Sequence, residues 1–430
     1  GNGRPICLSV SSLRNLVSDL RPKLLVVKAA MNVNGGAARD LLRNLPEISK
    51  YCHVKFACLN ILDSQKSFLL NQGITVIVPE EQWVAKGGLF NEITAGQERS
   101  SAKAWRESPS INDAIGWADI IHLTGGNGSM EFTQLVPKTK PIHLHFLESK
   151  PGLHDDISHL KPDGGGRWRA PLMHLLQIYQ RKKVEKSFSL FKNNSRWEVS
   201  ANSKFSAANL LRIYQIKGEI LYPSVDLSEF SRNCSESEIL TLDKLNLPSN
   251  GSYLVTVGRI SRFKGIYETV ERIKNSGLAL VVIGGGNIKE NESLRLFGKN
   301  IEVDIYILSG INSETMQAVL RNSVAVIGLA HGEAFGLTPI EAMAIGVPPL
   351  FVDEGGYRET IIDGENGRLI SRHDLKGWGE ALEQAQDLEM RSRWSISGLK
   401  RLKELGLSPE NHAEKLQSKL NSMLSMEETI

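Results

Sequence analysis

Residues 24–32 of the chain read LLVVKAAMN, and Gly35 and Gly36 follow them. A short apolar run that ends in turn residues is typical of a strand buried inside a parallel sheet. The next residues, AARDLLRNL, space their apolar side chains as a helix does. A strand, a glycine loop and a helix are the opening unit of a doubly wound sheet, so this stretch predicts an α/β fold.

Apolar runs of the same kind recur along the chain and fall into two series. The first series predicts strands at residues 54–59, 74–78, 119–123, 141–146 and 196–201. The second series predicts strands at residues 253–258, 278–284, 303–308, 323–329 and 348–352. Helical stretches lie between the strands in both series. The sequence therefore predicts two Rossmann-like doubly wound domains that face a cleft.

The expected domain boundaries follow from the polar segment between the two series. Residues 231–252 are polar and poor in apolar side chains at both ends, so we interpret them as an interdomain connection. The first domain is expected over residues 1–240 and the second over 241–405. The tail at 391–426 is helical in pattern, and residues 406–430 are expected to form a C-terminal helix that can return to the first domain.

The composition is that of a globular protein of at least two domains. The 430 residues are 41% hydrophobic and 23% charged, which excludes a disordered chain, a collagen and a small disulfide-stapled protein. Residues 1–230 carry 29 basic and 21 acidic residues, whereas residues 231–430 carry 22 and 27. The basic half is the better candidate for an anionic partner, although sequence drift explains such an imbalance equally well.

The most informative segment for function is GEAFGLTPIEAMAIG at residues 332–346. Its two glutamates, Glu333 and Glu341, lie eight positions apart. Thr338 and Glu341 have the spacing of a capping box at a helix start, so a structural role for Glu341 stays open. That role does not account for Glu333. A glycine-edged loop that exposes amide groups at a helix N-terminus is suited to bind an anion, so the segment is also a candidate ligand site.

A second segment, GRISRFKG at residues 258–265, follows a predicted strand directly. Arg259 and Lys264 could bind a diphosphate, the guanidinium as a fork and the ammonium as a point charge. An ordinary solvated loop between a strand and a helix is the alternative, because two basic residues are common in such loops.

GRISRFKG and the longer stretch GEAFGLTPIEAMAIGVPPLFVDEGGYRETIIDGENG together resemble the signature of family 4 of the retaining glycosyltransferases. Members of this family have the GT-B architecture of two Rossmann-like domains that face a cleft. Glu333 and Glu341 match the E-x7-E motif of the family. Gly36 resembles part of its N-terminal glycine loop, and PIHLHF places His145 where the family usually has a histidine in the cleft.

The resemblance implies a role for each matching residue. Arg259 and Lys264 would neutralise the diphosphate of a nucleotide-sugar donor, and His145 would hydrogen-bond the sugar. Glu333 would hold hydroxyls of the donor sugar and Glu341 its ribose. Catalytic roles would fall to Glu333, Lys264, Arg259 and His145, and donor-binding roles to Gly36, Arg259, Lys264, Phe335, Gly336, Leu337, Thr338 and Glu341.

The function implied by the resemblance is a retaining transfer of a hexose, with mannose or glucose favoured, from a UDP- or GDP-sugar. The acceptor would be a glycan, a lipid-linked sugar or a small molecule, as in polysaccharide biosynthesis. The family needs no metal ion and no cofactor, and the sequence shows no D-x-D near a predicted strand end that would hold a metal. The two basic residues would take over the role of the metal.

Other functions stay open. A nucleotide-sugar epimerase or a phosphorylase would share the fold, and a catalytically dead nucleotide-sugar-binding module would share the site. An NAD(P)-dependent oxidoreductase would need the G-x-G-x-x-G that is missing after the first strand. A module without catalysis would not need Arg259 and Lys264 together with Glu333 and Glu341.

The sequence also bears on localisation and partners. Four scattered cysteines without a C-x-x-C pair and the absence of 18 consecutive apolar residues favour a cytoplasmic protein with reduced thiols. Residues 161–186 contain seven Lys/Arg and two Asp/Glu among apolar residues. This segment is expected either to lie on an anionic membrane, at its inner face, or to be an ordinary amphipathic helix. No nucleic-acid partner is expected.

Overall fold

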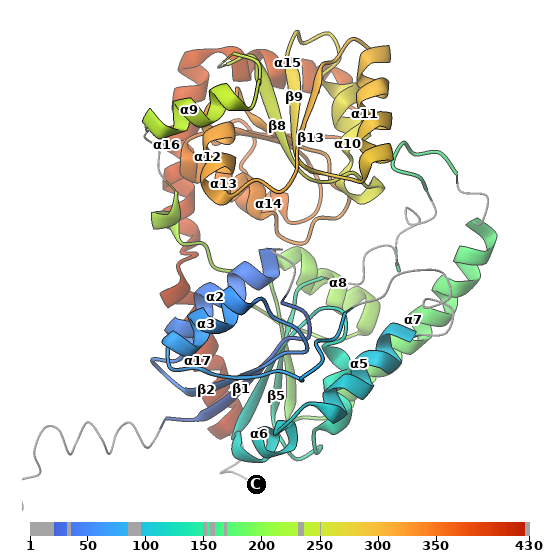
Figure 1. Cartoon of the computed structure of the whole chain (residues 1–430), viewed down its shortest axis with the longest axis vertical. Helices are drawn as coiled ribbons and strands as arrows, with labels where there is room; N and C mark the ends of the chain where they lie inside the picture. Colours follow the sequence, from blue (N-terminus) through green and yellow to red (C-terminus); the bar gives the residue numbers. More distant parts are fainter. Residues whose placement is uncertain are drawn as a thin grey trace, which may run out of the picture. The chain divides into compact units, whose positions relative to one another are not determined.

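The structure is a computed structural model of the 430-residue chain (Figure 1). It describes residues 21–31, 36–84, 96–148, 153–154, 160–166, 170–230, 236–249 and 251–425. The chain divides into two compact units. The first comprises residues 1–146, 189–200 and 409–430, and the second comprises residues 147–188 and 201–408.

The first unit is built on strands β1 to β6 of a sheet with the order β3-β2-β1-β4-β5-β6-β7, and the residues of β7 count with the second unit. The strands are β1 (Lys23–Val27), β2 (His53–Ala57), β3 (Thr75–Ile77), β4 (Ile120–Thr124), β5 (Ile142–Phe146), β6 (Trp197–Ala201) and β7 (Glu219–Ile220). β1 pairs in parallel with both β2 and β4. Its residues 24–27 are fully buried, which explains why the sequence shows an unbroken apolar run there.

Helices accompany the strands of the first unit and complete its α/β pattern. They are α2 (Gly36–Ile48), α3 (Asp63–Asn71), α5 (Gly96–Glu107), α6 (Ile111–Trp117), the 3-10 helix η1 (Met130–Leu135) and α17 (Pro409–Ser425). A longer helix, α7 (Ala170–Asn193), precedes β6, and its residues up to 188 count with the second unit. α17 packs against α2, so the two ends of the described chain meet in this unit (Figure 1).

The second unit has a sheet of six parallel strands in the order β10-β9-β8-β11-β12-β13. The strands are β8 (Tyr253–Arg259), β9 (Ala279–Gly285), β10 (Ile305–Leu308), β11 (Val326–Gly328), β12 (Pro349–Val352) and β13 (Arg368–Ile370). The core of this unit is continuous and includes fully buried aromatic residues such as Tyr253 and Trp378.

The helices of the second unit include two short 3-10 turns beside the sheet. In chain order they are α8 (Lys204–Tyr214), η2 (Leu227–Glu229), α9 (Glu236–Lys244), η3 (Arg262–Lys264), α10 (Ile266–Arg272), α11 (Ile288–Asn300), α12 (Ser313–Arg321), α13 (Leu337–Ile345), α14 (Tyr357–Thr360), α15 (Leu375–Gln386) and α16 (Leu388–Leu405).

The predicted fold class is confirmed, because both units are α/β structures around parallel sheets wound outward from a central strand. The sequence missed β7 and β13, which have two and three residues. It also missed α9, inside the segment expected to be a connection. That helix packs against α12, and its Glu238 is paired with Arg321, so a tertiary contact stabilises a polar stretch.

The division into units differs from the expected boundary after residue 240. Residues 147–188 and 201–240 count with the second unit, and residues 409–430 count with the first. The expected helix at 406–430 is observed as α17, and Gly406, with a φ of 57°, separates it from α16. The two helices of the tail therefore belong to different units. Residues 1–20 lie outside the described residues.

Candidate functional site

The strand order of the second sheet locates the candidate site. β8 and β11 are neighbours at its centre, although the chain passes through β9 and β10 between them. In doubly wound sheets, ligands bind beyond the carboxyl ends of the strands at the point where the winding reverses. The segment 259–265 begins at that end of β8, and the segment 329–336 follows β11. These two segments form the candidate site.

The loop after β8 carries two basic side chains. Arg259 ends the strand and is exposed. Ser261 caps η3, because its hydroxyl oxygen accepts a hydrogen bond from the backbone N–H of Lys264. Gly258 has a φ of 152°, and a Cβ there would lie 3.1 Å from Cγ of Lys264. Glycine at this position therefore makes room for the lysine side chain at the end of the strand.

The loop after β11 meets the lysine through Glu333. Nζ of Lys264 lies 2.7 Å from Oε2 of Glu333, and the two side chains keep 40% and 24% of their surface exposed. A ligand can therefore reach both members of the pair. The backbone N–H of Gly356 donates to the carbonyl oxygen of Glu333 over 2.8 Å. A Cβ on Gly355 would lie 2.5 Å from that oxygen, so glycine is required for this close approach.

The helix that follows this loop begins earlier than the sequence pattern predicts. α13 starts at Leu337, after an N-cap at Gly336 with a φ of 85°. The predicted capping box is therefore wrong, because Thr338 is the second residue of the helix and Glu341 the fifth. The reason is steric. A Cβ on Gly336 would lie 2.6 Å from the ring of Tyr357, so glycine fits here and also tolerates the left-handed conformation.

The predicted donor-binding residues around this helix start differ in access. Leu337 and Thr338 are half-buried, and their backbone amides belong to the first turn of α13, where N–H groups have no partner within the helix. Phe335 is 2% exposed and Glu341 is 4% exposed. The aromatic side chain belongs to the core, so a ligand at the first turn would meet the backbone and the more accessible residues.

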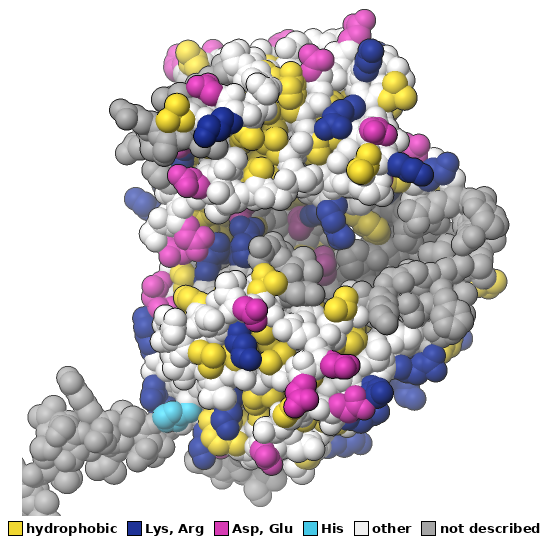
Figure 2. All heavy atoms as spheres, in the orientation of Figure 1, with side chains coloured by type: hydrophobic (Ala, Val, Ile, Leu, Met, Phe, Trp, Pro, Cys, Tyr) yellow, Lys and Arg dark blue, Asp and Glu magenta, His cyan; other side chains and the backbone are white. Residues whose placement is uncertain are grey.

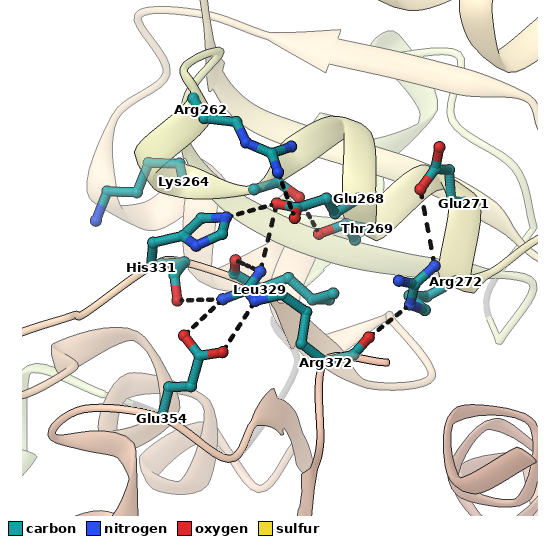
Figure 3. A network of polar contacts seen from close by, with 12 residues as sticks. Arg262, Lys264, Glu268, Thr269, Glu271, Arg272, Leu329, His331, Glu354 and Arg372 are labelled. Atoms are coloured by element: carbon teal, nitrogen blue, oxygen red, sulfur yellow. Dashed lines mark hydrogen bonds and ion pairs between the residues drawn. The ribbon is translucent and has the colours of Figure 1, made fainter. Parts of the chain in front are cut away.

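A network of polar contacts adjoins the ion pair (Figure 3). Its centre is Glu268, in the first turn of α10, which is 8% exposed. Nη2 of Arg262 lies 3.1 Å from Oε1 of Glu268. Nε2 of His331 lies 2.9 Å from Oε2 of the same carboxylate, and Nη1 of Arg372 lies 3.3 Å from it. Both carboxylate oxygens are therefore engaged.

Burial and charged neighbours act in opposite directions on the pKa of Glu268. Burial raises this pKa, whereas the hydrogen bond with His331 and the positive charges around the carboxylate lower it. The balance leaves the pKa of Glu268 below its ordinary value. Glu268 is therefore an ionised carboxylate at neutral pH, and it neutralises cations on two different loops.

Arg372, just after β13, ties the network to the loop that carries Glu333. Its guanidinium donates to the carbonyl oxygens of Leu329 over 2.8 Å and Ala330 over 3.2 Å. The same guanidinium lies 2.9 and 2.8 Å from the two carboxylate oxygens of Glu354, a bidentate pair. The side chain of Arg372 is 7% exposed, so this network is largely shielded from water.

Glu359, which no sequence motif marks, anchors the start of α8. Its carboxylate accepts hydrogen bonds from the backbone N–H groups of Lys204 and Phe205, each over 3.0 Å. The hydroxyl of Ser203, the N-cap of α8, donates to the carbonyl oxygen of Ala334. A serine before a helical run signals an N-cap. The partner carboxylate lies 155 positions further on and gives no local signal.

Two predicted site residues lie in the first unit. Gly36 is the first residue of α2, as expected for a glycine at the end of the β1 loop. His145 lies on β5 and is 3% exposed. Its ring centroid lies 6.2 Å from that of His122 and 5.8 Å from that of His412 on α17. The side chain expected to meet a sugar is thus packed inside its unit.

Comparison with known proteins shows that the region containing this site is similar to glycosyltransferases. Residues 240–401 match the family described as Glycosyl transferases group 1. A D-inositol 3-phosphate glycosyltransferase from Corynebacterium efficiens is 24% identical over 289 residues, which are 60% of this chain and 66% of that protein. A trehalose synthase from Pyrococcus horikoshii is 30% identical over 169 residues, or 36% of this chain and 41% of that protein.

Solved structures share the fold over nearly the whole chain. Sucrose-phosphate synthase from Thermosynechococcus elongatus superimposes with a TM-score of 0.71 at 16% identity, covering 94% of this chain and all of that one. Anabaena HepE in complex with UDP gives a TM-score of 0.67 at 14% identity and covers 93% of this chain and all of that one. At such identities the likeness concerns the fold.

Residues 240–401 of the second unit therefore resemble group 1 glycosyltransferase domains, and the chain shares its two-unit α/β fold with solved structures such as that of HepE. The matching stretches span less than two thirds of the curated relatives. The domain match at 240–401 includes all the residues of the loops after β8 and β11. The Lys264–Glu333 pair thus lies inside the matched region.

Three further findings concern the predicted partners. In the described part of the chain, no helix has both the length and the apolar character to cross a membrane. Within the same residues, no cluster of three or more His, Cys, Asp or Glu side chains is placed to hold a metal ion. Figure 2 shows basic and acidic side chains interspersed on the face that it draws.

Proposed function

We propose that the chain is a retaining, metal-independent glycosyltransferase. It moves a hexose from a UDP- or GDP-sugar to a glycan, a lipid-linked sugar or a small-molecule acceptor. The single observation that carries this proposal is the Lys264–Glu333 ion pair, which lies at the reversal point of the sheet inside a group 1 glycosyltransferase domain. Mannose and glucose are the favoured sugars.

The charges of the site support a role in holding and releasing a diphosphate. Arg259 and Lys264 lie on one loop, and the first turn of α13 offers backbone N–H groups with the positive end of the helix dipole. As the sugar leaves, negative charge grows on the diphosphate. A fixed cation stabilises that charge most in the transition state, so Lys264 would act on the rate of transfer.

Glu333 has two functions in this proposal. Its carboxylate fixes the ammonium group of Lys264, and its exposed part accepts hydrogen bonds from hydroxyls of the donor sugar. Glu341 would bind the ribose of the donor. Because the side chain of Glu341 is 4% exposed, the ribose would have to reach a nearly buried position beside α13 to make this contact.

Solved relatives give support for the donor class. The Anabaena HepE structures contain UDP, UDP with glucose, and UDP-glucose. Curated relatives are named for transfer to inositol phosphate and for trehalose synthesis. These are proteins of the same fold or domain family that handle nucleotide sugars or hexoses, so a hexose donor is the most economical assignment for this chain.

A donor panel tests the proposal. The purified chain is melted with UDP-, GDP- and ADP-sugars, and a ligand at 100 times its Kd should add about 2.7 kcal/mol of stability. The stabilising donor is then incubated with candidate acceptors, and the anomeric configuration of the first product is determined by NMR. We expect the configuration of the donor to be retained. Inversion, or conversion of the donor without a transfer product, would favour a different enzyme of this fold.

The exposed face of α7 favours an anionic membrane surface as a partner of the enzyme. Leu175, Ile178 and Tyr179 are exposed to 67%, 50% and 56% of their surface, and their spacing places them on one side of the helix. Lys182 continues the same side and is exposed. Apolar residues next to lysines on one helix face suit an anionic bilayer surface. We infer that α7 brings the enzyme to a lipid-linked acceptor.

Vesicle flotation tests this contact. The chain should float with vesicles that contain phosphatidylserine at low salt and should be released at high salt. Ile178→Glu should weaken flotation, whereas Ile396→Glu, at a still more exposed isoleucine on α16, should not. Equal flotation of the two variants, or none with the unmodified chain, would remove the membrane from the proposal.

A further inference from the structure

The lysine of the ion pair is fixed through its own turn. Arg262 and Lys264 are the two ends of η3, and Arg262 is paired with Glu268 over 3.1 Å. Glu268 lies four residues after Lys264. The backbone of residues 262–268 and the Arg262–Glu268 ion pair therefore form a closed ring that contains Lys264. A Cβ on Gly265, within this ring, would lie 2.1 Å from the carbonyl oxygen of Leu329. The turn is therefore seated directly against the other loop of the site.

The glutamate of the ion pair is fixed through the residues just before it. His331 precedes Glu333 by two residues, and its ring nitrogen Nε2 lies 2.9 Å from Glu268. The backbone N–H of His331 donates to the carbonyl oxygen of Phe263 over 2.7 Å. Arg372 holds the two residues before His331 by their carbonyl oxygens and lies 3.3 Å from the same carboxylate oxygen (Figure 3).

Both loops of the site thus converge on one buried carboxylate. We propose that Glu268 is a positioning residue, which holds the Lys264–Glu333 pair in the geometry that sugar transfer requires, with Arg372 as its partner. This inference rests on the proposed function and assigns Glu268 no contact with the donor. It explains why a charged network is buried beside a site whose own charges stay accessible.

The physical basis is the charge balance of the network. Glu268 and Glu354 are negative, and Arg262 and Arg372 are positive, so four buried or half-buried charges compensate one another. Removal of the Glu268 charge leaves the guanidinium groups of Arg262 and Arg372, on different loops, with Glu354 as their neutralising carboxylate. It also leaves His331 without its charged partner. Uncompensated buried charge is strongly unfavourable, so the loops must shift apart. A shift of about 1 Å at reacting groups can cost on the order of 10² in rate.

The first test is kinetic. Glu268→Gln keeps the size of the side chain and removes its charge. At saturating donor we expect kcat to fall by about 10²-fold, with a smaller change in the KM for donor, since the misplaced groups act in the transition state. Glu271→Gln is the matched control, because Glu271 lies on the same helix with 51% of its side chain exposed. Its kcat should stay that of the unmodified chain. Glu268→Asp should restore part of the lost rate.

The second test does not depend on catalysis. The rate at which an acetylating reagent modifies Lys264 is followed by mass spectrometry, with exposed Lys289 as the internal reference. The ion pair with Glu333 protects Lys264, so Glu268→Gln should raise its modification rate and Glu271→Gln should not. Arg372→Lys cannot form the bidentate contact with Glu354 and should also raise the modification rate of Lys264. This variant takes the place of Glu268→Gln in the test if Glu268→Gln does not fold.

The outcomes separate the two proposals. If no donor is transferred by the unmodified chain but Lys264 becomes more reactive in Glu268→Gln, the proposed function fails and the positioning role stands. If the unmodified chain transfers sugar while folded Glu268→Gln keeps both its kcat and its Lys264 reactivity, the positioning role is overturned and the function stands.

Discussion

Two buried histidines should make the first unit unstable below neutral pH. His122 on β4 and His143 on β5 are direct neighbours in the parallel register, and their Nδ1 atoms lie 2.9 Å apart. Nε2 of His143 lies 2.8 Å from Oγ of Ser200. Burial, and then the nearby rings of His143, His145 and His412, hold the pKa of His122 well below its ordinary value. Burial also lowers the pKa of His143.

The size of the effect follows from the proton balance. In the unfolded chain a histidine has a pKa of about 6.5, so it gains a proton as the pH falls from 7 to 5, whereas the buried pair stays neutral. The unfolded state then binds more protons than the folded state. The free energy of unfolding therefore decreases as the pH is lowered below about 6.5. Each histidine contributes a loss of about 2 kcal/mol over this range, or about 4 kcal/mol for the pair. Lys419 adds positive charge near His143 and acts in the same direction.

Urea unfolding at pH 7, 6 and 5 measures this loss, with pulsed hydrogen exchange and mass spectrometry of peptides from β4 and β5 as the local probe. His122→Asn should flatten the pH dependence by about 2 kcal/mol between pH 7 and 5. His373→Asn, at an exposed histidine of the second unit, should leave it unchanged. An unmodified chain whose β4 and β5 unfold at the same urea concentration at all three pH values would refute the reasoning.

Further predictions concern the second unit. Gly265→Ala should lower the free energy of unfolding, measured in urea, by at least about 2 kcal/mol more than Gly277→Ala does. Both glycines have a positive φ, but a Cβ would meet backbone atoms only at Gly265. Equal losses in the two variants would contradict the close contact at Gly265. Glu341→Gln should raise the donor KM with little change in kcat, and a lower kcat would contradict the ribose-binding role of Glu341. Thr338→Ala should change the free energy of unfolding by less than about 0.5 kcal/mol, because Thr338 is not the N-cap of α13. A larger loss of stability would show that Thr338 caps the helix. Transfer should survive EDTA, and activity restored by Mg²⁺ or Mn²⁺ after chelation would contradict metal independence.

The fold was predictable because buried parallel strands are continuous apolar runs. β1 and β8 are nearly free of polar residues, and each leads into a glycine-containing loop, so the sequence located both sheets from local pattern alone. The pairing of Lys264 with Glu333 was also within reach, since each residue follows a predicted strand. The two strands become neighbours through the winding order of the fold.

The rest of the site depends on contacts that no local pattern reveals. Arg372 meets Glu268 across more than a hundred residues of chain, through the placement of β13 beside β12. The start of α13 was misassigned because the capping-box spacing of Thr338 and Glu341 outweighed Gly336. The ring of Tyr357, in a later helix, leaves no room for a Cβ at Gly336, whose φ is 85°. His145 was placed by resemblance, and its burial beside α17 depends on a helix from the far end of the chain.

The central claim is that Lys264 stabilises the leaving diphosphate during sugar transfer, and the kinetics of Lys264→Ala test it most directly. The measurement is kcat at saturating donor, with Lys289→Ala as a control at an exposed lysine of the same unit and a melting curve for each variant. We predict that kcat falls on the order of 10²–10³-fold in Lys264→Ala and is unchanged in Lys289→Ala. A folded Lys264→Ala variant with the kcat of the unmodified chain would contradict the claim.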